Sequence, residues 1–171
     1  MGSIVAKQYI KLANKPIINH CLDQFKAAKF IDEIQLVVNA EHQVFYQQLT
    51  SEYDILPAIL GGKTRAESVH NGLIAIEKYN PDYVMIHDSV RPFVSQSLIQ
   101  ELYKNLSDHK AVVPVIPVKD TIKKVMEDNI IATINRDGLY CAQTPQAFDY
   151  KLIFAESVSY THLTLPTIYS V

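Results

Sequence analysis

VMIHDSVRPFV, residues 84–94, decides the fold prediction for this chain. The stretch begins as an apolar run typical of a buried strand and ends abruptly at the charged side chains of His87, Asp88 and Arg91. Pro92 then forces the backbone out of a regular element. In an α/β protein, ligands bind just past the carboxyl ends of the strands. The stretch therefore predicts a binding site there or, alternatively, an Asp–Arg pair that only caps a turn.

Helical and strand patterns alternate on both sides of this stretch. Helical spacing predicts helices over residues 16–29, 40–49 and 68–76, and from Ser95 or Ser97 to about residue 106. Apolar runs predict strands over residues 34–38, 55–60, 83–86 and 111–115. This alternation predicts an α/β sandwich whose sheet is largely parallel.

Composition narrows the class of protein. The 171 residues suffice for one domain, and a 48% hydrophobic content allows a core to be buried. A net charge of −2 gives no sign of a nucleic-acid or membrane-surface protein. No apolar run in the sequence is long enough to span a bilayer, and its first ten residues contain no secretory h-region. Cys21 and Cys141 match no metal or redox spacing, so we expect two buried thiols in a reducing cytoplasm.

A glycine pair, Gly61-Gly62, separates the strand predicted over residues 55–60 from the helix predicted over residues 68–76. In such a loop, backbone N–H groups at a helix start can point at a ligand, with the helix dipole behind them. The spacing matches neither a Walker loop nor a dinucleotide fingerprint. The pair therefore predicts a ligand loop or a turn, and a turn is the more common role of a glycine pair at a strand end.

A hairpin follows the last predicted strand. Residues 121–125 and 130–134 both alternate, and Asp128-Asn129 is a turn signal between them. The hairpin has little core-facing surface, and such a hairpin is marginal alone in water. We therefore expect an arm, over about residues 118–137, that lies against something else, such as a second subunit.

The chain lacks the usual catalytic sets. No serine lies in a nucleophile turn, and the hydrogen-bonded structural role is the more common one for a strand-end histidine such as His87. Cations, hydroxyls and one carboxylate at predicted strand ends remain: Lys7, Arg65, Ser68, Asp88, Arg91, Lys119, Thr121, Arg136 and Thr144. Phosphate chemistry uses such a set, because positioning and charge neutralisation lower its barrier. Each residue taken singly is better explained as surface charge or a turn hydroxyl than as part of a site.

Four motifs together resemble one family. GGKTRAESVHNGL, IHDSVRPFV, PVKDTIKKV and RDGLYCAQTPQAF occur in the order found in the 2-C-methyl-D-erythritol 4-phosphate cytidylyltransferases, the IspD family. The related ribitol-5-phosphate cytidylyltransferases share some of these segments, and Val90 leans towards them. The PVKDTIKK segment and the R-x-x-SV-x-x-GL pattern are stronger evidence and favour the methylerythritol enzymes.

The resemblance implies a three-layer, Rossmann-like nucleotidyltransferase sandwich with a mostly parallel sheet and a protruding β-hairpin arm. It implies that CTP and a polyol phosphate give a CDP-polyol and pyrophosphate, with Mg²⁺ bound mainly through the CTP phosphates and no metal ligand in the protein. The site residues carried over by motif are Lys7 and Asp88 as catalytic, Gly61, Gly62 and Ser68 on cytosine, and Asp88, Arg136 and Thr144 on the polyol phosphate. The arm would cross to the other subunit of a homodimer, which brings Arg136 to the neighbour's site.

Both ends depart from the family pattern. The family has a strand and a glycine-rich phosphate loop before a Met-Gly, and this sequence begins at Met-Gly. Residues 157–171, SVSYTHLTLPTIYSV, match no family element, so we expect a single cytidylyltransferase domain over residues 1–156 and a non-family tail. We accordingly expect no measurable activity from the chain as given. A catalytically dead nucleotide-binding remnant is the alternative from another class.

Overall fold

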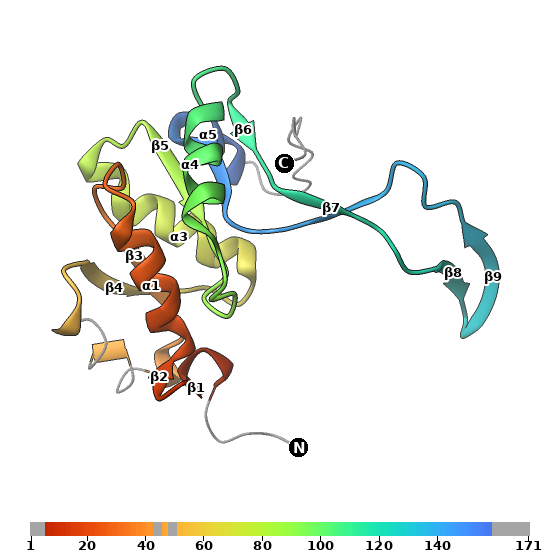
Figure 1. Cartoon of the computed structure of the whole chain (residues 1–171), viewed down its shortest axis with the longest axis horizontal. Coiled ribbons are helices and arrows are strands. Elements are labelled where there is room, and N and C mark those ends of the chain that lie inside the picture. Colours follow the sequence, from red (N-terminus) through yellow and green to blue (C-terminus); the bar gives the residue numbers. More distant parts are fainter. Residues whose placement is uncertain (1–5, 43–45, 48–50, 159–171) are drawn as a thin grey trace.

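A body of helices and strands carries a long two-stranded arm, as Figure 1 shows. The structure is a computed structural model that describes residues 6–42, 46–47 and 51–158. The arm leaves one side of the body and ends in a hairpin far from it. Within the described residues, no helix has the length and apolar character needed to cross a membrane.

The elements alternate along most of the chain. The helices are α1 (Ile17–Ala27), α3 (Arg65–Ile76), α4 (Gln96–Asn105) and α5 (Tyr150–Val158), with the 3-10 helices η1 (Lys7–Tyr9), η2 (Ala40–His42) and η3 (Glu77–Tyr79). The strands are β1 (Lys11–Leu12), β2 (Lys15–Pro16), β3 (Gln35–Val38), β4 (Leu56–Leu60), β5 (Tyr83–Ile86), β6 (Ala111–Val112), β7 (Val115–Pro117), β8 (Ile122–Met126), β9 (Asn129–Ile134), β10 (Tyr140–Ala142) and β11 (Gln146–Asp149).

The strands of the body form two main ladders and one short antiparallel pair, β1 with β2. β3 and β4 pair in parallel. β11 lies between β5 and β6 and pairs antiparallel with both. Because both neighbours run against β11, β5 and β6 run in the same direction. The carboxyl end of β5 is therefore at the same edge as that of β6.

Helices cover both faces of this sheet. Met85 of β5 packs with Phe25 of α1 and Leu98 of α4 on one face. Its neighbour Val84 packs on the other face against a cluster that contains Leu73 of α3. Successive strand residues point to opposite faces, so the alternation along β5 places a helical layer on each side. The predicted three-layer α/β sandwich is confirmed.

The two ladders are joined by helices. Among the described residues, β3 and β5 do not pair with each other. α1 nevertheless packs on both, through Leu22 with Leu36 of β3 and through Phe25 with Met85 of β5. α3 does the same from the opposite face, where it approaches β3 closely at Gly72. The glycine loop and the end of β5 thus belong to one body.

The arm consists of two antiparallel pairs. β7 pairs with β10 next to the body, and β8 pairs with β9 at the far end. Val125, Met126 and Ile130 near the tip are 56%, 60% and 65% exposed. The hairpin predicted from the alternation is confirmed, and no described part of the body covers its apolar side chains.

Several predictions of elements need correction. The largely parallel sheet contains one antiparallel strand that was not predicted, β11, whose sequence QAFD is too short to show a strand period; β3 and β4 are parallel, and β5 and β6 run in the same direction on either side of β11. α3 begins at Arg65, not at residue 68, because Thr64 caps it by accepting a hydrogen bond from the Glu67 N–H at 3.1 Å. The strand predicted over residues 111–115 divides into β6, in the body, and β7, which enters the arm.

Three further predictions concern the two cysteines, the helix after β3 and the C-terminal tail. Cys21 is buried as predicted, but Cys141 is exposed on β10, so the prediction of two buried thiols was wrong for Cys141. In the helix predicted over residues 40–49, η2 covers Ala40–His42, whereas residues 43–45 and 48–50 lie outside the described residues. The expected tail over residues 157–171 falls almost entirely outside them as well.

Candidate functional site

Asp88 lies directly after β5 and is held by two arginines. Arg65, the first residue of α3, donates to one carboxylate oxygen from Nη2 at 3.2 Å and from Nε at 3.4 Å. Arg91 donates from Nε to the other oxygen at 3.2 Å. One carboxylate between two guanidinium groups leaves a net positive charge at the strand end. This cluster of Asp88 with Arg65 and Arg91 therefore suits an anionic ligand.

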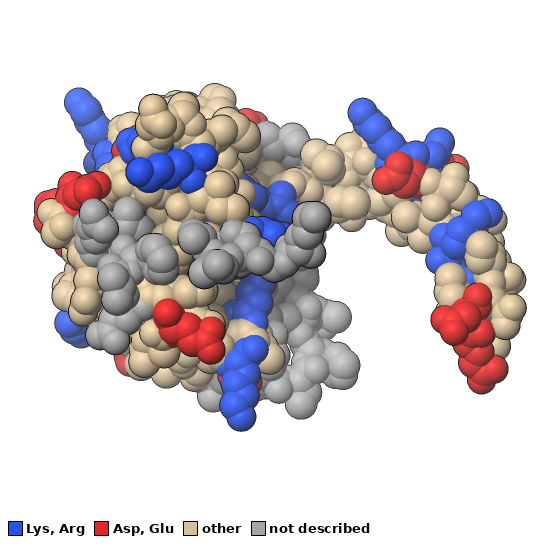
Figure 2. Space-filling model, turned by 90° about the horizontal axis from the view of Figure 1, so that it is seen from below, with Lys and Arg blue, Asp and Glu red and all other residues tan. Residues whose placement is uncertain are grey.

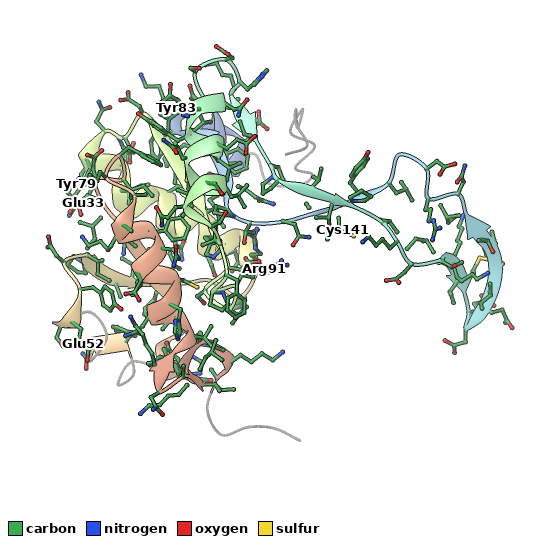
Figure 3. The ribbon with its side chains drawn as sticks, viewed as in Figure 1. Glu33, Glu52, Tyr79, Tyr83, Arg91 and Cys141 are labelled. Carbon is green, nitrogen blue, oxygen red and sulfur yellow. The ribbon has the colours of Figure 1, made fainter. Side chains whose placement is uncertain are left out.

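The loop before β11 completes this cluster. Gln143 accepts a hydrogen bond from Arg91 Nη1 at 2.6 Å through its side-chain oxygen. Thr144 Oγ1 lies 3.4 Å from the backbone nitrogen of Asp88 and 3.1 Å from Nδ1 of His87. β11 brings this loop to the end of β5, because Gln146 lies opposite Ile86 in the ladder. Figure 3 places Arg91 on the side of the body from which the arm leaves.

His87 is half-buried beneath the cluster. Its ring packs against Phe25 of α1, with the two ring centroids 5.0 Å apart. Burial lowers the pKa of His87, an effect that the hydrogen bond to the Arg91 carbonyl and the charge of Asp88 only partly offset. The imidazole is therefore neutral at pH 7 and holds its neighbours by hydrogen bonds, not by charge.

The glycine loop is shaped by the first turn of α3. A Cβ atom on Gly61 would lie 2.6 Å from Ser68 Oγ, and one on Gly62 would lie 2.2 Å from the Cβ of Glu67. Only glycine allows so close an approach of the loop to the helix. The pair is thus required by packing, whatever else it does.

Side chains of α3 take up the N–H groups of this loop. Gly62 N–H donates to Ser68 Oγ at 3.1 Å, and Lys63 N–H donates to Glu67 Oε2 at 2.7 Å. Ser68 Oγ in turn donates to the Thr64 carbonyl at 2.9 Å. The N–H groups of Gly62 and Lys63 therefore have partners within the protein, as in the turn that was one of the two alternatives for the glycine pair. Its helix start is capped internally.

The structure brings some of the predicted site residues together and leaves others apart. Asp88 and Thr144 meet at the end of β5. Arg65 links them to the glycine loop, because it begins α3. Lys7 lies in η1 with its side chain exposed, and no ion pair among the described residues joins it to Asp88. Arg136 lies on the arm, where it donates to the Lys119 carbonyl.

Sequence reasoning missed one member of the cluster and left another undecided. Gln143 stood in a polar loop with no assigned role, although a QTPQ motif beside the strand-end cluster was the available signal. Arg65 was assigned to a motif without a clear part, and its contact with Asp88 now supplies one. Among the described residues, no three His, Cys, Asp or Glu side chains gather closely enough to hold a metal ion.

The family model of 2-C-methyl-D-erythritol 4-phosphate cytidylyltransferase (IspD) matches residues 1–163. This chain belongs to that family. A bifunctional IspD/IspF enzyme of Wolbachia pipientis wMel is 41% identical over 155 residues, which are 88% of this chain and 39% of that protein. The cytidylyltransferase of Clostridioides difficile strain 630 is 41% identical over 156 residues, which are 90% of this chain and 65% of that protein.

Solved structures of the family agree in fold. The 4-diphosphocytidyl-2C-methyl-D-erythritol synthase of Anaerococcus prevotii superposes with a TM-score of 0.81 at 34% identity, over 96% of this chain and 74% of that one. The Francisella tularensis 2-C-methyl-D-erythritol 4-phosphate cytidylyltransferase superposes with a TM-score of 0.77 at 29% identity, over 91% and 71%. The family and the nucleotidyltransferase fold predicted from the four motifs are thereby confirmed.

Proposed function

We propose that this protein transfers CMP from CTP to 2-C-methyl-D-erythritol 4-phosphate and releases pyrophosphate. The observation that carries the proposal is the Asp88 carboxylate between Arg65 and Arg91, beside the Thr144 hydroxyl, at the end of β5 in a chain of this family. The Clostridioides difficile relative is named as a methylerythritol phosphate cytidylyltransferase, and the matching IspD family model has the same description, which favours that substrate over ribitol 5-phosphate.

The reaction needs no protein nucleophile. A phosphate oxygen of the polyol phosphate attacks the α-phosphorus of CTP in line, the bond to the β-phosphate oxygen breaks, and pyrophosphate leaves. The barrier falls through positioning and charge neutralisation. Lys7, a mobile point charge on an exposed side chain, is the residue we assign to the α-phosphate. Asp88 is oriented by two arginines and accepts hydrogen bonds from ligand hydroxyls.

Cytosine binding is assigned to Gly61, Gly62 and Ser68. The amino group of cytosine donates hydrogen bonds and needs an acceptor. The N–H of Gly62 is a donor that already serves Ser68 Oγ, so the Gly62 carbonyl oxygen is the backbone atom of this residue that can accept from cytosine. A carbonyl accepts from an amino group and rejects the carbonyl that uracil carries at the same position. This arrangement gives a physical reason for the choice of CTP over UTP.

The polyol phosphate is assigned to Thr144 and Arg136. These two residues lie far apart in one chain, since Thr144 is in the body and Arg136 is on the arm. Arg136 can reach a site like that of Asp88 when the arm of one copy lies along the body of another. We therefore propose a homodimer in which Arg136 serves the partner's site.

The surface of the arm supports this assembly. Ile116, Ile130 and Tyr140 are 53%, 65% and 54% exposed, and a two-stranded ribbon with such apolar exposure is unstable alone. Figure 2 shows basic side chains next to acidic side chains at the tip of the arm. Apolar contacts from the ribbon and charged contacts from its tip suit a self-complementary interface.

Mg²⁺ fits this site as an ion carried by the nucleotide. Both oxygens of Asp88 already accept from arginines, and Mg²⁺ is commonly held by substrate phosphates with few protein ligands. When bound, it neutralises charge on the triphosphate. We propose a cytoplasmic location, where the exposed free thiol of Cys141 remains reduced.

Pyrophosphate release tests the proposal. The chain spans 65% of the Clostridioides difficile relative. We would therefore assay the chain as given and also a longer form, which carries the corresponding segments of that relative at each end. This longer form is called the extended chain below. The extended chain is expected to release pyrophosphate from CTP only with a polyol phosphate, and faster with methylerythritol phosphate than with ribitol phosphate. A preference for ribitol phosphate would favour the other enzyme. Nucleotide binding without turnover would favour a binding remnant.

A further inference from the structure

The two ring nitrogens of His87 have different partners. Nε2 lies 3.0 Å from the carbonyl oxygen of Arg91, and Nδ1 lies 3.1 Å from Thr144 Oγ1. A carbonyl oxygen only accepts hydrogen bonds, so Nε2 must carry the proton and donate it. In a neutral ring, Nδ1 then has only a lone pair. It must accept the hydrogen of the Thr144 hydroxyl.

The surroundings keep the ring neutral. α1 contributes the Phe25 ring, which packs against the imidazole, and Cys21, whose thiol donates to the Ser89 carbonyl of the loop after β5 and, with its pKa raised to about 11 by burial, carries no charge at pH 7. The loop after β5 contributes Asp88 and Arg91, whose charges act on His87 in opposite directions. The loop before β11 contributes the uncharged Thr144. No charged partner on these elements therefore protonates the ring.

The direction of the Thr144 hydroxyl follows. A hydroxyl has one hydrogen to donate and two lone pairs that accept. The hydrogen goes to His87 Nδ1, and the backbone N–H of Asp88, at 3.4 Å, points to one lone pair. One lone pair remains for a ligand. Towards the site, Thr144 can thus only accept, and an ionised phosphate oxygen offers it no hydrogen.

We propose that His87 is a positioning residue that fixes Thr144 as a hydrogen-bond acceptor for a hydroxyl group of the polyol phosphate. The inference rests on the proposed function for the identity of the ligand. It adds that Thr144 binds the polyol part, whereas the phosphate group is left to cations such as Arg136. His87 touches no ligand and acts only through Thr144.

Two amide variants separate the two ends of the ring. In His87→Asn, the side-chain oxygen reaches about as far as Nδ1 and can still accept from Thr144. In His87→Gln, the amide nitrogen reaches about as far as Nε2 and can still donate to the Arg91 carbonyl. For the unchanged 171-residue protein and for each variant, we would measure the dissociation constants for methylerythritol phosphate and for CTP by calorimetric titration.

His87→Gln should weaken the binding of methylerythritol phosphate about fivefold, the value of one ordinary hydrogen bond. His87→Asn should bind it nearly as tightly as the unchanged protein, and CTP binding should change in neither variant. Equal losses in both variants, or a loss for CTP as well, would mean that His87 only supports the fold.

Nitrogen NMR of the histidine rings reads the hydrogen-bond direction without any ligand. At pH 7 the His87 signals should show a protonated Nε2 and a bare, hydrogen-bond-accepting Nδ1. A protonated Nδ1 would overturn the inference whatever the titrations give. Failure of methylerythritol phosphate to bind any form, with the expected His87 signals, would instead count against the proposed substrate and leave the direction of the hydroxyl established.

Discussion

Arg65 donates from two nitrogens to a single carboxylate oxygen of Asp88, at 3.2 Å and 3.4 Å, across a sequence separation of 23 residues. This contact ties the start of α3, and with it the glycine loop, to the end of β5. It is therefore the link between the proposed cytosine-binding and polyol-binding parts of the site.

Asp88→Asn should abolish most turnover and barely change stability. The ion pairs of Asp88 are partly exposed, with its side chain at 32% and those of Arg65 and Arg91 at 57% and 47%. Each such pair contributes about 0–1 kcal/mol to the free energy of unfolding. Turnover of the extended chain should fall at least about 100-fold, as for the loss of a preorganised polar group. A melting temperature that falls by more than a few degrees in Asp88→Asn would show that Asp88 is a structural cap.

Most of the body could be predicted from the sequence because its elements have strong local signals. β5 is an apolar run that stops at charge, and α4 begins at Gln96, directly after Ser95, which caps it by accepting a hydrogen bond from the Leu98 N–H at 3.1 Å. The position of β11 could not be predicted, because a strand of four residues inserted between β5 and β6 depends on long-range pairing.

The candidate site could be predicted only in part. The strand-end position of Asp88 followed from the local sequence. Its partners Arg65 and Thr144 lie 23 and 56 residues away, so local patterns could name them as candidates but could not place them together. The partners of the glycine loop could not be predicted for a related reason: Glu67 and Ser68, which accept from its N–H groups, belong to the following helix.

Gly62→Ala should destabilise the protein by about 1–3 kcal/mol, because the added Cβ would lie 2.2 Å from the Cβ of Glu67. Urea unfolding measures this loss. The matched test is the pair Gly62→Ala and Glu67→Gly. Glycine within a helix itself costs about 1 kcal/mol, but the double variant should be more stable than the sum of the two losses predicts. Strict additivity would contradict the proposed clash.

Asp149→Asn should reduce stability at pH 7 by about 0.5–1 kcal/mol, with a smaller difference at pH 3. Asp149 accepts from the Leu152 N–H at 3.0 Å and pairs with Lys110, and both interactions lower its pKa from the ordinary value of 3.8. A lowered pKa in the folded state means stability that is present above pH 3.8 and is lost as the pH falls through the folded pKa.

Asparagine caps the helix as well as aspartate does but does not titrate. The comparison therefore isolates the charge of Asp149, and urea unfolding at the two pH values reports it. The same difference in stability at both pH values would show that the carboxylate adds nothing beyond its cap.

Arg136→Ala should raise the KM of the extended chain for methylerythritol phosphate far more than that for CTP. Arginine suits a phosphate group because its planar fork donates two hydrogen bonds at once. Lys123 on the same arm already donates to Thr133 at 2.7 Å, so Lys123→Ala is the matched control and should change neither KM much.

Subunit mixing tests whether Arg136 acts in the partner's site. Arg136→Ala subunits are mixed with Lys7→Ala subunits, each nearly inactive alone. If Arg136 acts across the dimer, a mixed dimer has one site with both defects and one site with neither. Activity should then partly return on mixing. No recovery despite confirmed subunit exchange would place Arg136 within its own subunit or outside the site.

Phosphorus NMR of CTP incubated with methylerythritol phosphate, Mg²⁺ and the extended chain tests the central claim directly. We predict that the triphosphate and phosphomonoester signals decline together, while a new diphosphate ester and free pyrophosphate appear in equal amounts, and that Asp88→Asn suppresses both. Loss of CTP without a new diphosphate ester, or a mixture unchanged by the extended chain, would contradict the assignment of this protein as a methylerythritol phosphate cytidylyltransferase.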